Sequence, residues 1–436
     1  MSSPVAHIPS AKSLPFLGSS LSIYRQGLQA FAVEHWRKHG DVFRAKILNT
    51  EFVFLAGPEA NTFFTKNELA YFSPKEVWDD FAREAETEVF LAAMEGKELR
   101  ALRKITKKPY SRQYLEQKWD RLWTITDEFL TKTENQNKPI FPLMQELVCE
   151  QIGLIALNSS AVNQIKSLSA FLTTLLGVTT GVYPKLALKS PGYISAKKEV
   201  LALGKRIVDE HTGTQREEPD VLDYFMEACK TDPDLVKESD LVLSAIGPYI
   251  AGIDTAASSM AFIMYAMTHH QVQHVVKKEL AEMEDFSAGN VQKAVALQAL
   301  VAETMRMYVT TPAVPRMAEV DFEFGGHMIP KGQRLMIASG VAHYAEKFYP
   351  EPGRFILERC MPPRMEHRKA GAWVPFGLGS HTCAGAGFAK VQIAATIACL
   401  LSKCTVHTNE KLELEVGRAV YPGKKLVGGW RRDDRS

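Results

Sequence analysis

One cysteine lies in a loop that is suited to presenting its sulfur. Cys383 belongs to the segment 373–385, which also carries glycines at positions 377, 379 and 385, and the apolar stretch 386–401 follows directly. Glycines permit backbone conformations and close approaches that a Cβ would block. A sulfur beside the first turn of a helix meets free backbone N–H groups and the positive end of the helix dipole, and both favour a thiolate. We therefore predict that Cys383 is the functional cysteine and that the other five are bystanders.

A second candidate is an acid and an alcohol inside a long apolar stretch. Between residues 241 and 268 there is no Lys, Arg or Glu, and the only charged residue is Asp254, which Thr255 follows. About 20 apolar residues can cross a bilayer, but a carboxylate at the bilayer centre costs at least ~2.5 kcal/mol. We therefore expect a helix that is apolar on all sides because it runs through a large protein core. In that setting Asp254 and Thr255 are candidates for proton delivery.

The composition narrows the class of protein that must position these residues. The chain has 436 residues, and Lys+Arg 52 against Asp+Glu 50 leaves a formal charge of +2. This balance gives no reason to expect nucleic acid or an anionic membrane as a partner. The six cysteines include no CxxC pair and are too few for a disulfide framework. The first thirty residues hold no apolar run, so we expect no signal peptide, no transmembrane anchor and a cytoplasmic location.

Hydrophobic periodicity predicts a mainly α-helical protein with a minor β region. We predict strands at 43–56, which is rich in β-branched and aromatic residues, and at 322–337, where Gly and Pro residues mark turns. The helical period is clearest over 120–149, 235–274 and 391–401. The strands come from both ends of the chain, and no repeat, flexible linker or shift in composition divides it. We therefore predict a single domain over residues 1–436.

The cysteine loop resembles a known signature. The pattern Phe376-x-x-Gly379-x-x-x-Cys383-x-Gly385 is similar to the haem-binding motif of the cytochrome P-450 family of haem-thiolate monooxygenases. The resemblance implies that Cys383 is the axial thiolate ligand of haem b, with Phe376 and Gly385 beside the cofactor. It also implies the cytochrome P-450 fold, a triangular helical bundle around haem. His381 stands where many members have Arg, and we expect it to donate to a haem propionate.

A helical segment before the cysteine loop resembles the ExxR motif of the same family. Its residues Glu303 and Arg306 are three positions apart, so both side chains lie on one helical face. The partner that the resemblance implies is Arg359, in a segment where Leu357 replaces the usual Pro. Without the resemblance, Glu303 and Arg306 would be an ordinary surface ion pair.

The acid–alcohol pair also resembles a family motif. The sequence Ala251-Gly252-Ile253-Asp254-Thr255-Ala256 is similar to the oxygen-activation motif of the family's long central helix. The resemblance implies that Gly252 leaves room for O2 beside the helix, and that Asp254 and Thr255 are catalytic.

Haem propionates are anionic and need positively charged partners. The resemblance places such partners at Arg103 and Arg316, with His381 as a third. Leu99 occupies a position where bacterial members often have His, so we expect one propionate contact to be missing. Each of these basic residues could otherwise be an ordinary surface charge.

Basic residues cluster between Lys97 and Arg112, interrupted only by Glu98. The cluster consists of Lys97, Arg100, Arg103, Lys104, Lys107, Lys108 and Arg112. Such a run is usually a solvated helix face, but in a nearly neutral protein it can steer an acidic partner. The chain shows no flavin or nicotinamide fingerprint. The resemblance therefore implies that electrons come from NAD(P)H indirectly, through a separate reductase and a ferredoxin or flavodoxin. We expect the ferredoxin or flavodoxin to dock on this basic face. The resemblance also implies a monomer.

The resemblance implies insertion of one oxygen atom from O2 into a lipophilic substrate, by hydroxylation or epoxidation, in secondary metabolism. The amino-terminal half is similar to cyanobacterial and retinoid-oxidising members, and terpenoid, retinoid, fatty-acid and polyketide–peptide substrates remain open. The substrate contacts implied are Trp78, Phe81, Phe90, Leu91, Ile246, Tyr249, Ile250, Ala251, Val309, Val314 and Pro315. One alternative is a peroxide-driven peroxygenase or a haem-thiolate isomerase. The other is a non-catalytic haem sensor or carrier.

Overall fold

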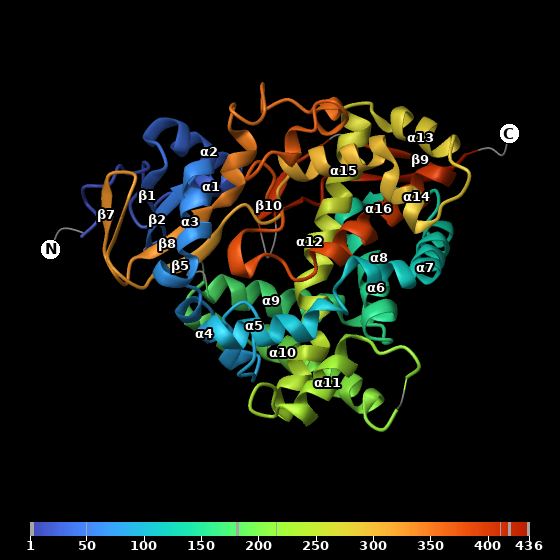
Figure 1. Ribbon diagram of the computed structural model, residues 1–436, viewed down its shortest axis with the longest axis horizontal. Helices are drawn as coiled ribbons and strands as arrows, with labels where there is room; N and C mark the ends of the chain where they lie inside the picture. The colour runs from blue at the N-terminus through green and yellow to red at the C-terminus, as the bar shows by residue number, and fades with distance from the viewer. Residues whose placement is uncertain are drawn as a thin grey trace.

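A sheet-rich side, which holds the amino terminus, and a larger helical side make up the molecule in Figure 1. The computed structural model describes residues 4–48, 50–179, 183–214, 216–409, 411–416 and 420–433. The outline narrows toward the helices from the middle of the chain, which are drawn in green (Figure 1). This architecture confirms the predicted mainly helical protein with a minor β region.

Strands from both ends of the chain share one five-stranded sheet, in the order β1-β2-β8-β5-β3. Their bounds are β1 (Val42–Ile47), β2 (Thr50–Ala56), β3 (Phe72–Ser73), β5 (Val314–Ala318) and β8 (Arg334–Ala338). β2 and β8 pair in parallel, with Val53 opposite Leu335, and the other neighbours pair antiparallel. Val53 and Leu335 are fully buried. The strands expected at 43–56 and within 322–337 are confirmed.

Smaller sheets complete the β structure. The hairpin β6 (Phe322–Phe324) and β7 (His327–Ile329) precedes β8. A three-stranded sheet, in the order β4-β12-β9, joins β4 (Lys138–Pro139), β12 (Val427–Arg432) and β9 (Cys404–Thr408). β10 (Leu414–Val416) pairs with β11 (Val420–Pro422).

Helices form most of the remaining described chain. The α-helices are α1 (Ser20–Gln26), α2 (Leu28–His39), α3 (Pro58–Tyr71), α4 (Lys75–Glu84), α5 (Gly96–Lys107), α6 (Arg112–Gln117), α7 (Trp119–Lys132), α8 (Ile140–Ala156), α9 (Ile165–Thr179), α10 (Pro191–His211), α11 (Val221–Thr231), α12 (Leu241–His269), α13 (Gln273–Ala281), α14 (Ala288–Lys293), α15 (Val295–Met307) and α16 (Ala386–Lys403). Short 3-10 helices are η1 (Val162–Gln164), η2 (Lys185–Lys189), η3 (Glu238–Asp240), η4 (Ser339–Tyr344), η5 (Leu357–Cys360), η6 (Glu366–Arg368) and η7 (Gly379–His381).

The long helix α12 runs through the helical side and packs against α8, α10, α15 and α16. Every side chain from Ala256 to Met267 is buried, which explains why this helix is apolar on all sides. Two helical segments in the described chain, Glu238–His269 and Ala386–Lys403, are long and apolar enough to cross a membrane. Their most apolar windows are 78% and 67% buried inside the protein, so core packing accounts for their composition.

The prediction of one helical segment over 120–149 is wrong in its middle. α7 ends at Lys132, Asn135 has a φ of +58°, and β4 intervenes before α8 begins at Ile140. Asn tolerates the left-handed conformation better than most residues, and Pro139 has no N–H to continue a helix. The apolar period continues on both sides of the break because both helices pack against the same core.

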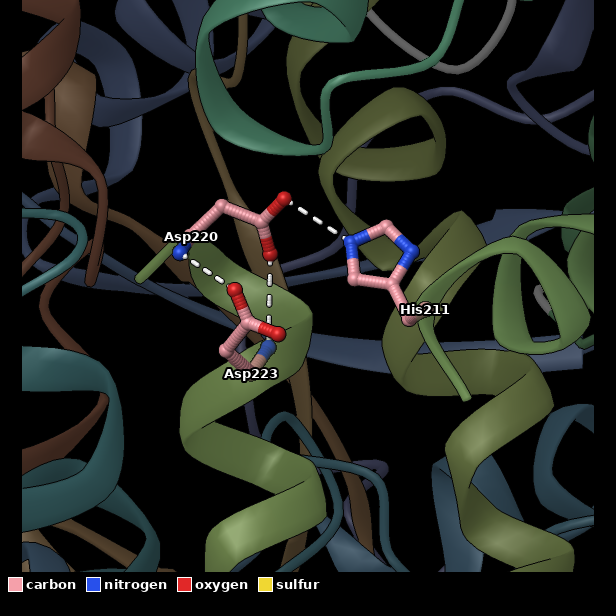
Figure 2. A group of neighbouring side chains, drawn as sticks. All are labelled: His211, Asp220 and Asp223. Atoms are coloured by element: carbon pink, nitrogen blue, oxygen red, sulfur yellow. Dashed lines mark hydrogen bonds and ion pairs between the residues drawn. The ribbon is translucent and has the colours of Figure 1, made fainter. Parts of the chain in front are cut away.

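A buried acidic cap joins α10 to α11 (Figure 2). Asp220 Oδ1 accepts hydrogen bonds from the N–H groups of Leu222 and Asp223, at 3.0 and 3.3 Å, and Asp223 Oδ2 accepts from the Asp220 N–H at 3.0 Å. This is a capping box. Asp220 Oδ2 lies 2.8 Å from His211 Nε2 and 2.9 Å from Asn158 Nδ2. Both carboxylate oxygens of Asp220 are therefore occupied by hydrogen bonds within the protein. We interpret His211, Asp220 and Asp223 as a structural group that caps α11.

Candidate active site

The cysteine loop makes tight turns that its glycines allow. Gly377 and Gly379 have φ values of +78° and +68°, in the left-handed region. The Cys383 N–H donates to the Phe376 carbonyl at 2.8 Å, which closes the loop. α16 begins at Ala386, so the sulfur lies just ahead of a helix start. The loop thus holds the sulfur in one place relative to α16.

The Cys383 side chain is accessible although protein surrounds it. The sulfur is therefore within reach of a ligand although neighbouring residues desolvate the thiol. Burial raises the pKa of the Cys383 thiol, while the Gly385 backbone N–H and the Arg103 guanidinium act to lower it. A metal bound to the sulfur takes the place of its proton, because a ligating thiol must be deprotonated.

The middle of α12 has an accessible patch. Ala251 is exposed within this largely buried helix, and Thr255 lies one turn further along the same face. The Thr255 hydroxyl donates to the Ala251 carbonyl at 2.9 Å. Because the hydroxyl oxygen can still accept a hydrogen bond, Thr255 can take part in proton transfer on this face.

Asp254 points elsewhere. Its side chain is buried, and Gln145 Nε2 on α8 donates to Asp254 Oδ1 at 2.7 Å. The acid and the alcohol therefore lie on adjacent faces of α12. Thr255 is the member of the pair that meets the accessible patch.

Gly252 has a packing role that sequence analysis did not anticipate. A Cβ at this position would lie 2.6 Å from the Cδ1 atom of Ile152 on α8. A glycine therefore lets the Ile152 side chain pack against α12, and the predicted room for O2 beside Gly252 stays a prediction.

Two arginines carry buried donors that lack partners. Arg103 Nη2 donates to the Thr382 carbonyl, next to Cys383, and Arg316 lies over the Phe64 ring with its guanidinium carbon 5.6 Å from the centroid. The Nε atoms of both arginines are buried and have no hydrogen-bond partner among the described residues. Since buried polar groups are normally hydrogen-bonded, these cationic donors fit the propionates of a haem.

His381 is arranged differently from the expectation. Its Nδ1 lies 2.7 Å from Glu68 Oε1 and its Nε2 lies 2.9 Å from the Met94 carbonyl oxygen. Both ring nitrogens are thus taken by protein oxygens. The predicted hydrogen bond from His381 to a propionate has no free ring donor in this geometry.

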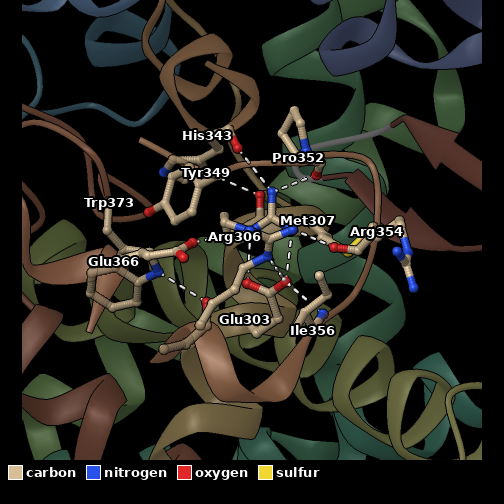
Figure 3. Close-up of polar contacts among 12 residues, drawn as sticks. Glu303, Arg306, Met307, His343, Tyr349, Pro352, Arg354, Ile356, Glu366 and Trp373 are labelled. Carbon is tan, nitrogen blue, oxygen red and sulfur yellow. Dashed lines mark hydrogen bonds and ion pairs between the residues drawn. The ribbon is translucent and has the colours of Figure 1, made fainter. Parts of the chain in front are cut away.

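The structure brings Glu303, Arg306 and Arg359 together in the core, where all three are fully buried. Figure 3 shows the contacts of Glu303 and Arg306. Arg306 Nε and Nη2 donate to the two oxygens of Glu303 at 2.7 and 2.8 Å, and Arg359 Nε lies 3.4 Å from Glu303 Oε1. Arg359 Nη1 also donates to Glu366 Oε2 at 3.0 Å. A surface ion pair does not describe this group.

The buried ion cluster is tied to the cysteine loop through His343. Arg306 Nη1 donates to the carbonyls of His343 and Pro352 at 2.9 and 2.8 Å. Burial, with the nearby Arg306 charge, lowers the pKa of His343 to about 3, so the ring is neutral. His343 Nε2 accepts the Val374 N–H at 2.8 Å, two residues before Phe376.

The predicted substrate contacts fall into two groups, those whose side chains are accessible and those whose side chains are buried. Those with surface left for a ligand are Trp78, Phe90, Leu91, Ile250, Ala251, Val314 and Pro315. Those at 3% exposure or less are Phe81, Ile246, Tyr249 and Val309. Tyr249 lies on the opposite side of α12 from Ala251, and its hydroxyl donates to the Ser159 carbonyl. We correct these four residues from substrate contacts to core.

Sequence reasoning missed Glu68, Gln145 and His343. No local motif marks any of them, because each acts on a residue that is distant in the chain. Glu68 alone has a signal, since it follows Ala60 and Phe64 at four-residue spacing on the buried face of α3. A single carboxylate on an apolar helix face is a candidate functional group.

Comparison with known proteins decides the family. The family model described as Cytochrome P450 matches residues 8–416. The chain is a cytochrome P450. It is therefore a haem-containing monooxygenase that uses O2, and Cys383, Arg103 and Arg316 are the residues that would hold the haem in this cytochrome P450.

Relatives of this cytochrome P450 include plant and insect enzymes. The "Abscisic acid 8'-hydroxylase CYP707A1" of Solanum lycopersicum is 24% identical over 91% of this chain and 84% of that protein. The "Beta-amyrin 11-oxidase" of Glycyrrhiza uralensis is 26% identical over 63% and 59%. "Cytochrome P450 6a8" of Drosophila melanogaster is 28% identical over 59% of this chain, and only 54% of that protein is matched.

Solved structures share the fold. The structure titled "Retinoic acid bound cyanobacterial CYP120A1" superposes with a TM-score of 0.85 at 21% identity, over 98% of this chain and 99% of that chain. The "cytochrome P450DA heme domain" superposes with a TM-score of 0.84 at 16% identity, over 98% of both chains. The predicted cytochrome P450 fold is confirmed.

Proposed function

We propose that this cytochrome P450 hydroxylates or epoxidises a lipophilic substrate of the isoprenoid class in secondary metabolism. It would act as a cytoplasmic monomer, with electrons from a separate ferredoxin or flavodoxin and its reductase. The observation that carries the proposal is that Cys383 and the Ala251–Thr255 face are both accessible, while Arg103 and Arg316 have buried Nε donors without a partner among the described residues. These groups supply an iron ligand, a proton-transfer hydroxyl and charge partners for a haem.

Each residue has a separate task in the proposed reaction. The haem, when bound, supplies the redox iron at which O2 is reduced. Cys383 ligates that iron, and Arg103 and Arg316 fix the orientation of the cofactor through its propionates. Thr255 presents its hydroxyl on the accessible face of α12. Asp254 lies on the adjacent face, where Gln145 holds its carboxylate, and is the acid proposed to replenish that proton indirectly.

The substrate class rests on the lining residues and on the relatives. The side chains that keep accessible surface, among them Trp78, Phe90, Leu91 and Ile250, are aromatic or aliphatic, so they suit an apolar molecule. The names of three similar proteins refer to abscisic acid, β-amyrin and retinoic acid, and all three are isoprenoids. We expect retinoic acid, abscisic acid or β-amyrin to shift the haem spin state at lower concentration than a fatty acid. A spin-state response to fatty acids alone would reject the isoprenoid assignment.

One comparison separates the monooxygenase from its alternatives. We expect the reduced carbon monoxide complex to show the absorption of a thiolate-ligated haem, and Cys383→Ser to lose it. Product should form with NADPH, reductase and ferredoxin and should contain an atom from labelled O2. Product only with hydrogen peroxide would indicate a peroxygenase, rearrangement without oxygen incorporation an isomerase, and no product with any screened compound a sensor or carrier.

The basic face of α5 is the proposed docking surface for the redox partner. Leu99, Leu102 and Thr106 form the buried side of this helix. The opposite side exposes Lys97, Arg100, Lys104, Lys107 and Lys108. The Phe388 N–H in α16 donates to the Tyr110 carbonyl at 3.2 Å, so the chain just after α5 lies against the helix that follows Cys383. A partner bound here would approach the haem from the cysteine side.

A further inference from the structure

A buried carboxylate lies among the positive groups of the haem-binding region. Glu68 is only 4% exposed and comes from α3, on the sheet-rich side of the molecule. Carboxylates are almost never fully buried unless they are paired. Neither the cysteine motif nor the acid–alcohol pair uses this residue, so its presence needs its own explanation.

Three groups converge on Glu68. The Ser380 N–H donates to Oε2 at 2.5 Å, His381 Nδ1 lies 2.7 Å from Oε1, and Arg316 Nη2 lies 3.9 Å from the same oxygen. Burial alone would raise the pKa of Glu68, but the hydrogen bonds from His381 and Ser380 lower it below its usual value. The carboxylate is therefore ionised and holds two consecutive residues of the cysteine loop.

The backbone of the loop is shaped around this carboxylate. Gly379 has a φ of +68°, and a Cβ built on it would lie 2.0 Å from Glu68 Oε2. No side chain fits between the loop and the carboxylate. The glycine of the cysteine motif is thus required here by the close approach of Glu68 as well as by the turn.

We propose that Glu68 is a positioning residue of the haem-thiolate site, which latches the segment Gly379–His381 onto α3 and thereby fixes the loop that carries Cys383. Its negatively charged carboxylate faces Arg316 and accepts hydrogen bonds from the loop that carries Cys383. It should therefore disfavour the ferrous state of a bound haem, since net charge and hydrogen bonding around the site set the reduction potential. The proposal is independent of the substrate and of the redox partner.

The test compares Glu68→Gln, which keeps the shape and removes the charge, with Glu59→Gln. Glu59 is on the same helix but forms an exposed ion pair with Lys347. We expect E68Q to move the ferric/ferrous potential to more positive values, and to speed loss of the thiolate-type carbon monoxide spectrum several-fold. E59Q should do neither. Equal potentials and equal spectral stability in E68Q and E59Q would overturn the proposal.

Glu68→Asp separates charge from position. The shorter carboxylate retains the charge but cannot reach both Ser380 and His381, so we expect a potential close to that of the unaltered protein with partial spectral stability. An E68D protein that behaves like E68Q in both measurements would reject the role of the charge. The readouts need only haem, a reductant and carbon monoxide. Failure of the proposed substrate assignment would therefore leave this result interpretable.

A double-variant cycle tests the contact between the carboxylate and the loop without a measurement of potential. Gly379→Ala places a methyl group against the carboxylate, so its effect on bound haem per chain should be several-fold larger with Glu68 present than in Glu68→Ala. The turn strain from the positive φ is the same in both backgrounds and cancels in the comparison. Additive effects of the two substitutions would contradict the latch.

Discussion

At the scale of single residues, removing the Thr255 hydroxyl tests the proposed proton delivery most directly. Its hydroxyl lies on the accessible face of α12 and is held by the Ala251 carbonyl. Thr255→Ala should retain haem and the carbon monoxide spectrum, but form product about 10²-fold more slowly, within the usual range for loss of an acid–base group. Because NADPH is still consumed, product formed per NADPH should fall. Product and NADPH measured in the same reactions give this ratio.

A matched control for this substitution is Thr124→Ala. Thr124 lies on α7 and makes the same kind of hydrogen bond, to the Asp120 carbonyl at 2.8 Å, on the exterior. It should leave the coupling ratio unchanged. Coupling in Thr255→Ala that equals coupling in Thr124→Ala would remove Thr255 from the proton path.

At the level of elements, the buried ion cluster between α15 and η5 should contribute strongly to stability. Glu303→Gln removes the carboxylate charge that faces Arg306 and Arg359 in the core. Leaving a buried charge without its partner costs about 3–5 kcal/mol. We expect a loss of that order in the free energy of unfolding measured by urea titration.

Glu351→Gln is the surface counterpart. Glu351 and Arg354 have the same three-residue spacing as Glu303 and Arg306, but both are largely exposed. Solvent screens such pairs, so the substitution should change stability little. Similar losses from E303Q and E351Q would mean that burial of the cluster is not what makes it important.

The cap between α10 and α11 should make stability depend on pH. Burial alone would lower the pKa of His211, but its hydrogen bond and charge interaction with Asp220 raise it above 6.5. The folded protein then binds this proton more tightly than the unfolded chain. The stabilisation is fully present below about pH 6.5, and it is lost as pH rises through the folded pKa.

Thermal unfolding at a series of pH values measures this effect. The unaltered protein should lose more stability on the alkaline side than His211→Gln, because the variant has no proton to lose at that position. His274 is exposed at the start of α13, so His274→Gln should keep the alkaline loss. Parallel pH profiles for the unaltered protein and H211Q would contradict the assignment.

Elements that repeat a local pattern were predictable, and contacts across long sequence distances were not. The core helix α12 and the sheet strands follow from periodicity and residue type. Pairing of Glu303 with Arg306 followed from spacing and from the family resemblance. Glu68 could not be assigned, because its partners Ser380 and His381 are 312 and 313 residues away. The roles of Phe81 and Tyr249 also depend on which neighbours cover them, and a sequence does not specify those neighbours.

The molecule as a whole is nearly neutral, and the proposed docking surface for the ferredoxin or flavodoxin is the basic face of α5. Charge reversal at Lys104 and Lys108 should slow reduction of the haem by an acidic ferredoxin at low salt. The deficit should shrink as salt is added, because screening removes the attraction in the unaltered protein as well. Stopped-flow reduction at several ionic strengths measures both effects.

Lys331→Glu provides the comparison. Lys331 is exposed in the turn between β7 and β8, and both strands lie on the sheet-rich side of the molecule (Figure 1). Its reversal changes net charge without altering α5, so reduction should be nearly unaffected. Equal slowing by K331E would indicate a response to net charge rather than docking on α5.

The parallel pairing of Val53 with Leu335 also sets an order of events during synthesis. Ribosomes add about 5–20 residues per second, so β2 waits on the order of 15–60 s for β8. During that time the first hairpin offers an open edge, which is a site for mispairing. The sheet, the cysteine loop and the Glu68 latch can close only when most of the chain has emerged. Haem capture is therefore a late event, and nascent chains of this protein should depend on chaperones until then.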